Sequence, residues 1–359
     1  MKRAPSNAAV VGLGLIGCSI GLALRAQGWV VTGTDTDPGR AARALELGAV
    51  DSIELDRRAA IAFVAVPASS VVAVADRLLS GDETGALVVT DVASVKLPIA
   101  NALSHPRFVP GHPMAGSEQD GPDGADRDLF AGATWVLTPT GETDEAGFSV
   151  VRDVVTSLGA DVVALPPDRH DDLVAIVSHV PHLTSATLMS LAAESQVDRG
   201  ALMRLAASGF RDMTRIAAGS PSIWPDICSE NSGAIVPVLD RLIERLGEIR
   251  RIVAESDRAG LMSMLEGARS ARRNLPSRGE RPRATVELRV LVPDRPGVLA
   301  EVTAMASRMS ANIYDIEIAH STEGPRGVLV LVVDEALGGP LVAELRSSAF
   351  KVSVAGASS

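Results

Sequence analysis

A glycine-rich turn near the amino end constrains the fold of this chain more than any other feature. Residues 10–17 read Val-Val-Gly-Leu-Gly-Leu-Ile-Gly, so Gly-x-Gly-x-x-Gly directly follows an apolar run and opens a helical stretch. In such a unit the first glycine permits a tight turn, the second lets the backbone approach a pyrophosphate, and the third lets helix and strand pack closely. The sequence predicts a dinucleotide-binding loop at a helix N-terminus, formed by Gly12, Leu13, Gly14, Leu15, Ile16 and Gly17.

The residues that follow predict a parallel α/β sheet. Between residues 8 and 168, short Val/Ala/Ile/Leu runs alternate with helical stretches such as Pro38–Leu47 and Ser69–Leu79. Continuous apolar runs are typical of parallel strands buried on both faces, and strand–helix–strand repetition predicts a doubly wound, Rossmann-type sheet. The expected strands are Ala8–Val11, Val30–Thr34, Ile61–Val66, Ala86–Asp91, Arg107–Val109, Thr134–Leu137 and Asp161–Leu165.

Two more segments indicate which cofactor the loop takes. Asp35 ends the second expected strand, 18 residues after Gly17, where its carboxylate can accept hydrogen bonds from a ribose hydroxyl. Its charge would repel a 2′-phosphate, so the sequence favours NAD over NADP, although Asp35 also fits a simple turn residue. Val66 and Pro67 end the third strand, at the sheet edge where the cofactor would lie.

The rest of the chain divides into a helical region and a small terminal module. Residues 169–274 show apolar positions three and four apart, as in Ile235, Val238, Leu239, Leu242, Ile243, Leu246 and Ile249. This apolar content exceeds what one thin bundle buries, which predicts a homodimer. Residues 275–284 form a polar linker, and residues 285–359 have the strand–helix–strand–strand–helix–strand order of a ferredoxin-like fold.

Composition excludes several classes of protein. The net charge of −10, from 34 basic and 44 acidic residues, disfavours a nucleic-acid binder. Cys18 and Cys228 form neither a metal-ligand spacing nor a disulfide framework, which fits a reducing, cytoplasmic setting and predicts no metal site. We expect no membrane span, because no run of 18 or more apolar residues is present. A lipoprotein signal ending at Cys18 is disfavoured, because the chain stays apolar after that residue.

Polar side chains gather in four short motifs. Two of them follow expected strands: Asp-Val-Ala-Ser-Val-Lys at residues 91–96 and Gly-His-Pro-Met-Ala-Gly-Ser-Glu at residues 111–118. The helical region adds Ser-His-Val-Pro-His at residues 178–182 and Phe-Arg-Asp-Met-Thr-Arg at residues 210–215. Lys96 is one of only three lysines, so it is more than casual surface charge, although a lone lysine is structural more often than functional.

Together with the glycine loop and Pro-Ser-Ile-Trp-Pro-Asp-Ile at residues 221–227, these motifs resemble the prephenate/arogenate dehydrogenase family. The resemblance covers residues 8 to about 270, and Pro-Asp-Arg-Pro-Gly-Val-Leu at residues 293–299 resembles an ACT regulatory domain. It implies NAD-dependent oxidative decarboxylation of prephenate to 4-hydroxyphenylpyruvate in tyrosine biosynthesis. Arogenate dehydrogenase and a dual-specificity cyclohexadienyl dehydrogenase are the alternatives within the family.

The resemblance also implies roles for individual residues. His112 would accept the proton of the 4-hydroxyl, and Ser94 would orient His112 or that hydroxyl close to the nicotinamide. Arg215 would bind the ring carboxylate through its planar fork, with Arg211 as the competing choice. His182 would contact the side-chain keto group or carboxylate, with His179 behind it or in helix packing. Glu118 and Asp212 would be gating or structural acids, and Trp224 would be core or a pocket wall. Ser117 is a further implied substrate-binding residue.

The sequence also bears on the choice of substrate, on two rival functions and on regulation. Imidazoles rather than carboxylates in residues 178–182 mildly favour prephenate, because the ammonium of arogenate would prefer a carboxylate. A β-hydroxyacid dehydrogenase is disfavoured because residues 171–270 contain no lysine, and a non-catalytic sensor is the other rival. A tyrosine effector is expected at the terminal module, near Asp294, Gly297 and Asn312.

Overall fold

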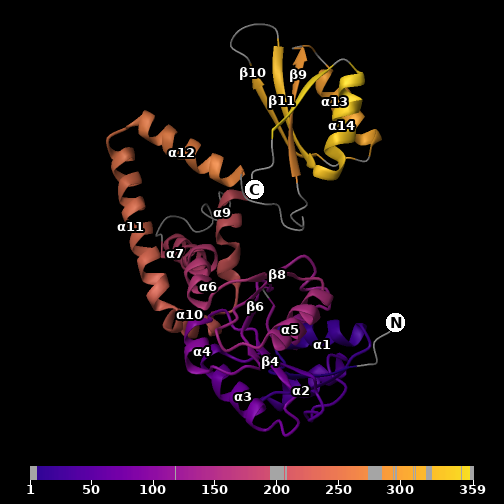
Figure 1. Ribbon diagram of the computed structural model, residues 1–359. Coiled ribbons are helices and arrows are strands. Elements are labelled where there is room, and N and C mark those ends of the chain that lie inside the picture. Colours follow the sequence, from indigo (N-terminus) through magenta and orange to yellow (C-terminus); the bar gives the residue numbers. More distant parts are fainter. Residues whose placement is uncertain are drawn as a thin grey trace. The chain divides into compact units, whose positions relative to one another are not determined.

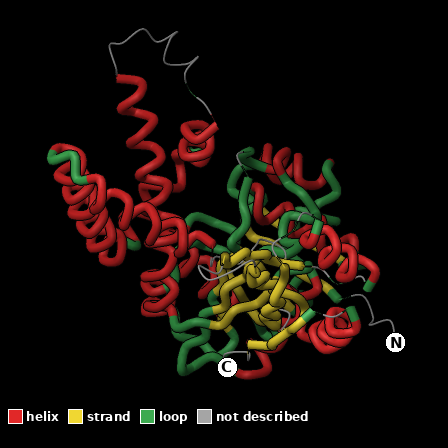
Figure 2. Tube along the Cα trace, turned by 90° about the horizontal axis from the view of Figure 1, so that it is seen from above, coloured by secondary structure: helices red, strands yellow, loops and turns green. Residues whose placement is uncertain are grey.

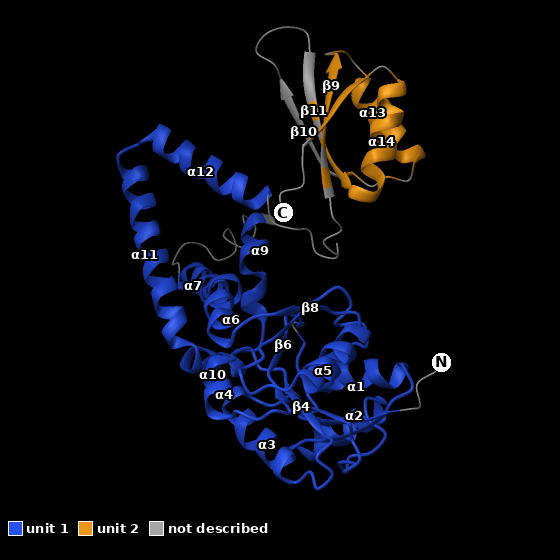
Figure 3. Cartoon of the chain, in the orientation of Figure 1, with its two compact units in different colours: residues 1–278 blue, residues 279–359 orange. Residues whose placement is uncertain are grey.

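The computed structural model describes residues 6–117, 119–194, 206, 208–273, 285–293, 295, 297–309, 311, 313–320, 326–348 and 350–355. These residues form two compact units, 1–278 and 279–359, which are coloured separately in Figure 3. The division falls inside the polar segment 275–284. The regions expected as 1–168 and 169–274 belong to one unit, so side chains from both can build a common site.

A five-stranded parallel sheet forms the centre of unit 1 (Figure 1), in the order β2-β1-β3-β4-β5. Its strands are β1 (Asn7–Val11), β2 (Val30–Thr34), β3 (Ile61–Val64), β4 (Val88–Asp91) and β5 (Phe108–Val109). The connecting helices are α1 (Leu15–Ala26), α2 (Pro38–Glu46), α3 (Ala68–Ser80) and α4 (Leu97–Ala102). All residues of β3 and β4 are buried, so the predicted Rossmann-like sheet is confirmed. Its strand order reverses between β1 and β3, where such folds bind ligands.

The expectation of one continuous parallel sheet is wrong beyond Val109. A separate sheet contains β6 (Gly111–Pro113), β7 (Thr134–Leu137) and β8 (Asp161–Ala164), with α5 (Glu145–Ser157) between the last two. β6 runs antiparallel to β7, and β8 runs parallel to it. Pro110 interrupts the strand after β5, because proline has no N–H for a ladder. His112 consequently lies on a strand rather than in a loop.

Aromatic side chains join the two sheets of unit 1. Trp135 on β7 is fully buried. Its ring meets Phe63 of β3 edge-on at 6.3 Å and Phe130 at 5.1 Å between ring centroids. Few aromatics are available in this chain, and three of them pack here to hold β6–β8 against the parallel sheet.

The second half of unit 1 is helical, as expected. Its elements are α6 (Pro167–Val174), a π-helical turn η2 (Ala175–His179), α7 (Val180–Glu194), α9 (Ser208–Thr214), the 3₁₀ turns η3 (Arg215–Ala218) and η4 (Pro221–Ile223), α10 (Trp224–Glu230), α11 (Ser232–Ala254) and α12 (Arg258–Arg273). No strand occurs among its described residues, and its long helices are red in Figure 2. A further 3₁₀ turn, η1 (Pro122–Gly124), precedes β7.

One helical run, Pro167–Glu194, is long and apolar enough to cross a membrane by length and composition. Core helices of soluble proteins pass the same test. Of the apolar window in this run, 28% is buried in unit 1. Three polar side chains of the run, His170, Asp171 and His179, are buried there.

Unit 2 contains β9 (Thr285–Pro293), α13 (Val298–Arg308), β10 (Ile313–His320), β11 (Arg326–Asp334), α14 (Glu335–Ser347) and β12 (Lys351–Ala355). Its four strands form an antiparallel sheet in the order β10-β11-β9-β12. Leu288, Leu331 and Leu341 are fully buried between sheet and helices.

Candidate active site

The three motif glycines differ in what a side chain at each position would meet. Gly12 has φ +94°, and a Cβ there would lie 2.2 Å from the carbonyl oxygen of Ala65. A Cβ on Gly17 would lie 1.9 Å from the carbonyl oxygen of Gly12, so only glycine lets α1 pack this close to the turn. A Cβ on Gly14 would meet nothing within 4 Å. That open space, at a helix start that no side chain caps, fits a pyrophosphate.

Asp35 lies directly against the glycine loop. Its carboxylate accepts hydrogen bonds from the N–H groups of Leu13, at 2.7 Å, and Asp37, at 2.8 Å. Val66 lies on the other side of the turn, with its side chain 3.2 Å from the position of a Cβ on Gly12. Pro67 directly precedes α3 at the same carboxyl edge. The predicted dinucleotide residues therefore meet at the point where the strand order reverses.

A buried chain of three side chains ends on His112. Nδ1 of His112 lies 2.9 Å from Nε2 of His170, and Nδ1 of His170 lies 2.7 Å from Oδ1 of Asp171. All three side chains are buried. The carboxylate of Asp171 also accepts the backbone N–H groups of Lys96, at 2.8 Å, and Leu97, at 2.9 Å. The chain thus joins β6 to α6 and to the start of α4.

A buried ion pair fixes the backbone next to His112. Lys96 is fully buried and pairs with the carboxylate of Asp91 at the end of β4. Lys96 Nζ donates to the carbonyl oxygen of Gly111 at 2.7 Å, and the N–H of Gly111 donates to Asp91 at 3.2 Å. Burial lowers the pKa of Lys96, and the Asp91 carboxylate opposes that shift. Lys96 therefore has a structural role, because it holds the Gly111 backbone through a buried ion pair with Asp91.

A second set of polar contacts extends from Asp171 to side chains of the helical region. The side-chain amide of Asn231 donates to the carbonyl oxygen of Asp171 at 3.0 Å and lies 3.1 Å from Nδ1 of His179. The ring of His182 stacks on Trp224 with centroids 3.7 Å apart, and His179 meets the same indole edge-on at 6.2 Å. Nε2 of His179 is buried without a hydrogen-bond partner in the described residues. Such an atom suits a ligand or an ordered water.

Burial lowers the pKa values of His112 and His179 and so favours their neutral forms. Burial is the main cause that lowers the pKa of His112 well below its ordinary value, and the nearby His170, Lys96 and His179 lower it further. Burial lowers the pKa of His179 to about 4. A neutral imidazole has a free ring nitrogen, which is what a proton acceptor needs at neutral pH.

Comparison with known proteins identifies the family. Residues 20–164 match a model described as prephenate dehydrogenase, nucleotide-binding domain, and residues 166–267 match one described as prephenate dehydrogenase, dimerization domain. A prephenate dehydrogenase of Bacillus subtilis is 33% identical over 343 residues, 92% of each chain.

The chain belongs to the prephenate dehydrogenase family. Solved structures of two relatives agree with this result. A prephenate dehydrogenase from Aquifex aeolicus, in complex with hydroxyphenyl propionate and NAD⁺, matches 77% of this chain and all of that chain, with a TM-score of 0.69 and 27% identity. An arogenate dehydrogenase from Synechocystis matches 74% of this chain and 98% of that chain, with a TM-score of 0.63 and 31% identity. The β-hydroxyacid dehydrogenase and sensor alternatives are thereby set aside.

The remaining residues expected from the prephenate dehydrogenase motifs lie on exposed elements. Arg211 and Asp212 are exposed on α9, where Nε of Arg211 donates to the carbonyl oxygen of Ala206 at 3.1 Å. Arg215 opens the 3₁₀ turn η3, directly after α9, and is also exposed. η3 packs beside α7, the helix of His182.

Ser94 and Ser117, from the two strand-end motifs, are more exposed than His112. Ser94 lies half-buried in the loop after β4, and among the described residues no hydrogen bond joins it to His112, whose Nδ1 faces His170 instead. Ser117 is exposed and accepts the N–H of Gln119 at 3.0 Å. Glu118 lies outside the described residues.

Sequence reasoning missed His170, Asp171 and Asn231. His170 and Asp171 stand in Pro-Asp-Arg-His-Asp-Asp, which reads as a polar helix start, and Asn231 stands between two helices. The available signal was the histidine count, because His170 is one of only six in the chain.

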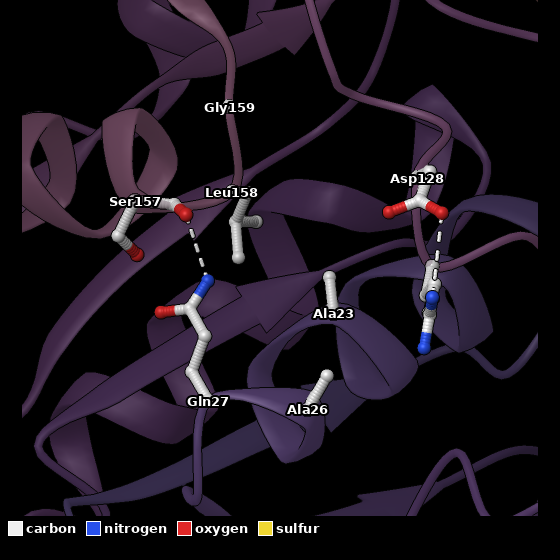
Figure 4. Close-up of a pocket in the computed structure, with 8 residues that line it drawn as sticks. Ala23, Ala26, Gln27, Asp128, Ser157, Leu158 and Gly159 are labelled. Atoms are coloured by element: carbon white, nitrogen blue, oxygen red, sulfur yellow. Dashed lines mark hydrogen bonds and ion pairs between the residues drawn. The ribbon is translucent and has the colours of Figure 1, made fainter.

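A shallow pocket elsewhere in unit 1 does not belong to this site (Figure 4). It has a volume of about 290 Å³ and lies at the carboxyl end of α1, away from the glycine loop. Gln27 donates across it to the carbonyl oxygen of Ser157 at 2.7 Å. Its lining residues are Ala23, Ala26, Gln27, Arg127, Asp128, Ser157, Leu158 and Gly159.

Proposed function

We propose that this protein oxidises prephenate with NAD⁺ to 4-hydroxyphenylpyruvate and CO₂, in the synthesis of tyrosine. The observation that carries the proposal is His112, a buried neutral imidazole held beside the carboxyl edge of a dinucleotide-binding sheet. NAD⁺ bound at the glycine loop supplies the hydride acceptor. Asp35 accepts the ribose hydroxyls, and its charge excludes a 2′-phosphate.

The protein's own residues bind and orient the substrate and take one proton. A ring nitrogen of His112 accepts the proton of the 4-hydroxyl as the C4 hydride passes to NAD⁺. The bond between the ring and its carboxylate then breaks, and CO₂ leaves. The electron pair of that bond makes the ring aromatic with a phenolate oxygen, which takes the proton back from His112. A positioned base of this kind is worth ~10²–10⁴-fold in rate. Lys96 and Asp91 hydrogen-bond to the backbone of Gly111 and so fix the position of β6, which carries His112.

Cationic and polar groups of the helical region bind the carboxylates and the keto group. We assign the ring carboxylate to Arg215, whose guanidinium can donate two parallel hydrogen bonds. We assign the side-chain carboxylate or keto group to His182, whose ring is held by stacking on Trp224. Ser94 is assigned to the hydroxyl end near the nicotinamide, and Ser117, Glu118 and Asp212 to the pocket entrance.

Prephenate is preferred over arogenate in this proposal because imidazoles line the side-chain end of the site. The experiment measures NADH absorbance with prephenate and arogenate offered separately, for the wild type and for His112→Asn. We expect faster turnover with prephenate, and loss of turnover without loss of NAD⁺ binding in the variant. Faster turnover with arogenate would reassign the substrate, and turnover within threefold of wild type in His112→Asn would remove His112 from the mechanism.

A homodimer through α11 and α12 completes the proposed assembly. In the described part of the chain, α11 buries only Ile235, while Ile243 is 66% and Leu246 52% exposed. Exposed apolar side chains that lie on one face of a helix mark an interaction surface. We expect Ile243→Glu to give monomers in sedimentation analysis and Glu244→Gln to stay dimeric. A dimeric Ile243→Glu protein would place the interface elsewhere.

Unit 2 is proposed as an ACT module that senses tyrosine. Its element order and antiparallel sheet support this assignment, and Gly297, with φ +86°, turns the chain into α13. Asp294 and Asn312, the other expected effector residues, lie outside the described residues. The test compares tyrosine inhibition of the full chain and of residues 1–276. Equal inhibition of both proteins would place the effect at the active site, and no inhibition of either would leave unit 2 with a structural role.

We place the enzyme in the cytoplasm.

A further inference from the structure

We propose that His170 is a positioning residue that sets the tautomer of His112, and that Asp171 sets the tautomer of His170. The catalytic consequence rests on the proposed function, whereas the tautomer itself follows from the hydrogen-bonded chain and can be measured without substrate.

The argument starts at Asp171, where the hydrogen-bond directions are fixed. The backbone N–H groups of Lys96 and Leu97 donate to its two carboxylate oxygens at 2.8 and 2.9 Å. A backbone N–H cannot act as an acceptor, so both oxygens accept. Oδ1 also contacts Nδ1 of His170 at 2.7 Å, and an ionised carboxylate can only accept there as well. The Nδ1 atom of His170 therefore carries a proton.

The proton on Nδ1 of His170 determines what its other ring nitrogen, Nε2, can do. With its proton on Nδ1, a singly protonated His170 presents the lone pair of Nε2 to Nδ1 of His112, 2.9 Å away. Nδ1 of His112 must then donate, which leaves the lone pair of His112 on Nε2. The nitrogen that accepts the substrate proton is thus chosen by a residue 58 positions along the chain.

Charges around the chain support this arrangement. A doubly protonated His170 would reverse the bond to His112 and bury a second cation close to Lys96, which is fully buried with Asp91 as its ion-pair partner. His179, the other imidazole near this group, is kept neutral by burial. When Nε2 of His112 takes up the hydroxyl proton, its Nδ1–H stays bonded to His170, and the Asp171 carboxylate balances the new charge through that ring.

The decisive measurement is the ¹⁵N NMR spectrum of the histidine rings at neutral pH. His112→Asn identifies the His112 signals, because the chain has only six histidines. We expect wild-type His112 to be protonated at Nδ1 and bare at Nε2. In His170→Leu, which removes the acceptor, the two tautomers should mix. In His170→Gln, whose side-chain oxygen can replace Nε2 as acceptor, the wild-type tautomer should persist.

Kinetics give the second readout. We expect His170→Leu to lower kcat at least tenfold with KM for prephenate and NAD⁺ within twofold, and His170→Gln to recover most of kcat. His105→Leu makes the same chemical change outside the site and should leave kcat unchanged. A purely structural role would affect both His170 variants through stability, which thermal melting measures, and would not move the His112 tautomer.

Two results would overturn the proposal: a proton on Nε2 of wild-type His112, or equal kcat for the Leu and Gln variants of His170. If the protein failed to oxidise prephenate but showed the expected spectra, the proposed function would fail and the positioning role would stand.

Discussion

Lys96 Nζ donates a hydrogen bond to the carbonyl oxygen of Gly111 at 2.7 Å, one residue before His112. Asp91 accepts the N–H of the same glycine and pairs with Lys96. One buried ion pair therefore binds both the N–H and the carbonyl oxygen of Gly111. The position of His112, the proposed base, depends on this pair.

Replacing Lys96 should destabilise the fold more than it alters chemistry. Lys96→Met leaves the buried Asp91 carboxylate without its partner, which costs about 3–5 kcal/mol. Denaturant unfolding measures the loss. Lys351→Met, at an exposed lysine of β12, should change stability by less than about 0.5 kcal/mol. Similar stability of the two variants would contradict the role given to the ion pair.

The glycine loop offers a matched pair of substitutions. Gly17→Ala forces a Cβ to within 1.9 Å of the carbonyl oxygen of Gly12, so we expect a loss of about 1–3 kcal/mol or more in stability. Gly14→Ala places its methyl in open space and should leave stability nearly unchanged while it weakens NAD⁺ binding. Calorimetry and fluorescence titration separate the two effects, and unaltered NAD⁺ affinity in Gly14→Ala would place the pyrophosphate elsewhere.

Asp35 should control the choice of cofactor through its charge. Asp35→Asn keeps an oxygen for the N–H of Leu13 but removes the charge that repels a 2′-phosphate. We expect the preference for NAD⁺ over NADP⁺, measured as a ratio of kcat/KM, to fall by roughly tenfold or more. Asp35→Ala additionally loses the bond to the loop and should bind both cofactors poorly. A wild-type enzyme that uses both equally would refute the assignment.

The two arginines of residues 211–215 can be distinguished kinetically. Arg215→Ala should raise KM for prephenate by roughly thirtyfold, about 2 kcal/mol, because the ring carboxylate loses a charged partner. Arg211→Ala, which removes a donor to the carbonyl oxygen of Ala206, should change KM by less than about threefold. The reverse ranking would transfer the carboxylate to Arg211.

Stability should fall in mild acid because buried imidazoles must be charged on unfolding. Burial lowers the pKa of His179 from 6.5 to about 4, so between these values the unfolded chain binds more protons than the folded chain. Stability is then complete above about pH 6.5 and is lost as pH falls toward 4. Melting temperatures across this range should decline, and less steeply in His179→Gln. An identical slope in the variant would show that His179 does not contribute.

Much of the local structure could be predicted from sequence alone. Thr134–Leu137 is both the expected and the observed strand, and the bounds of β1 and α2 differ by one residue from expectation. These elements depend on neighbouring residues, since periodicity, glycine and proline act over a few positions.

The glycine loop, the parallel strands and the family could be recognised from sequence, because each depends on motifs of neighbouring residues. The passage of the chain at Pro110 into a second sheet, and the hydrogen-bonded chain of His112, His170 and Asp171, are visible only in the folded protein. Residues 58 positions apart meet only when β6 and α6 pack together. Hydrogen bonds need atoms within about 3 Å, and no local pattern encodes that distance.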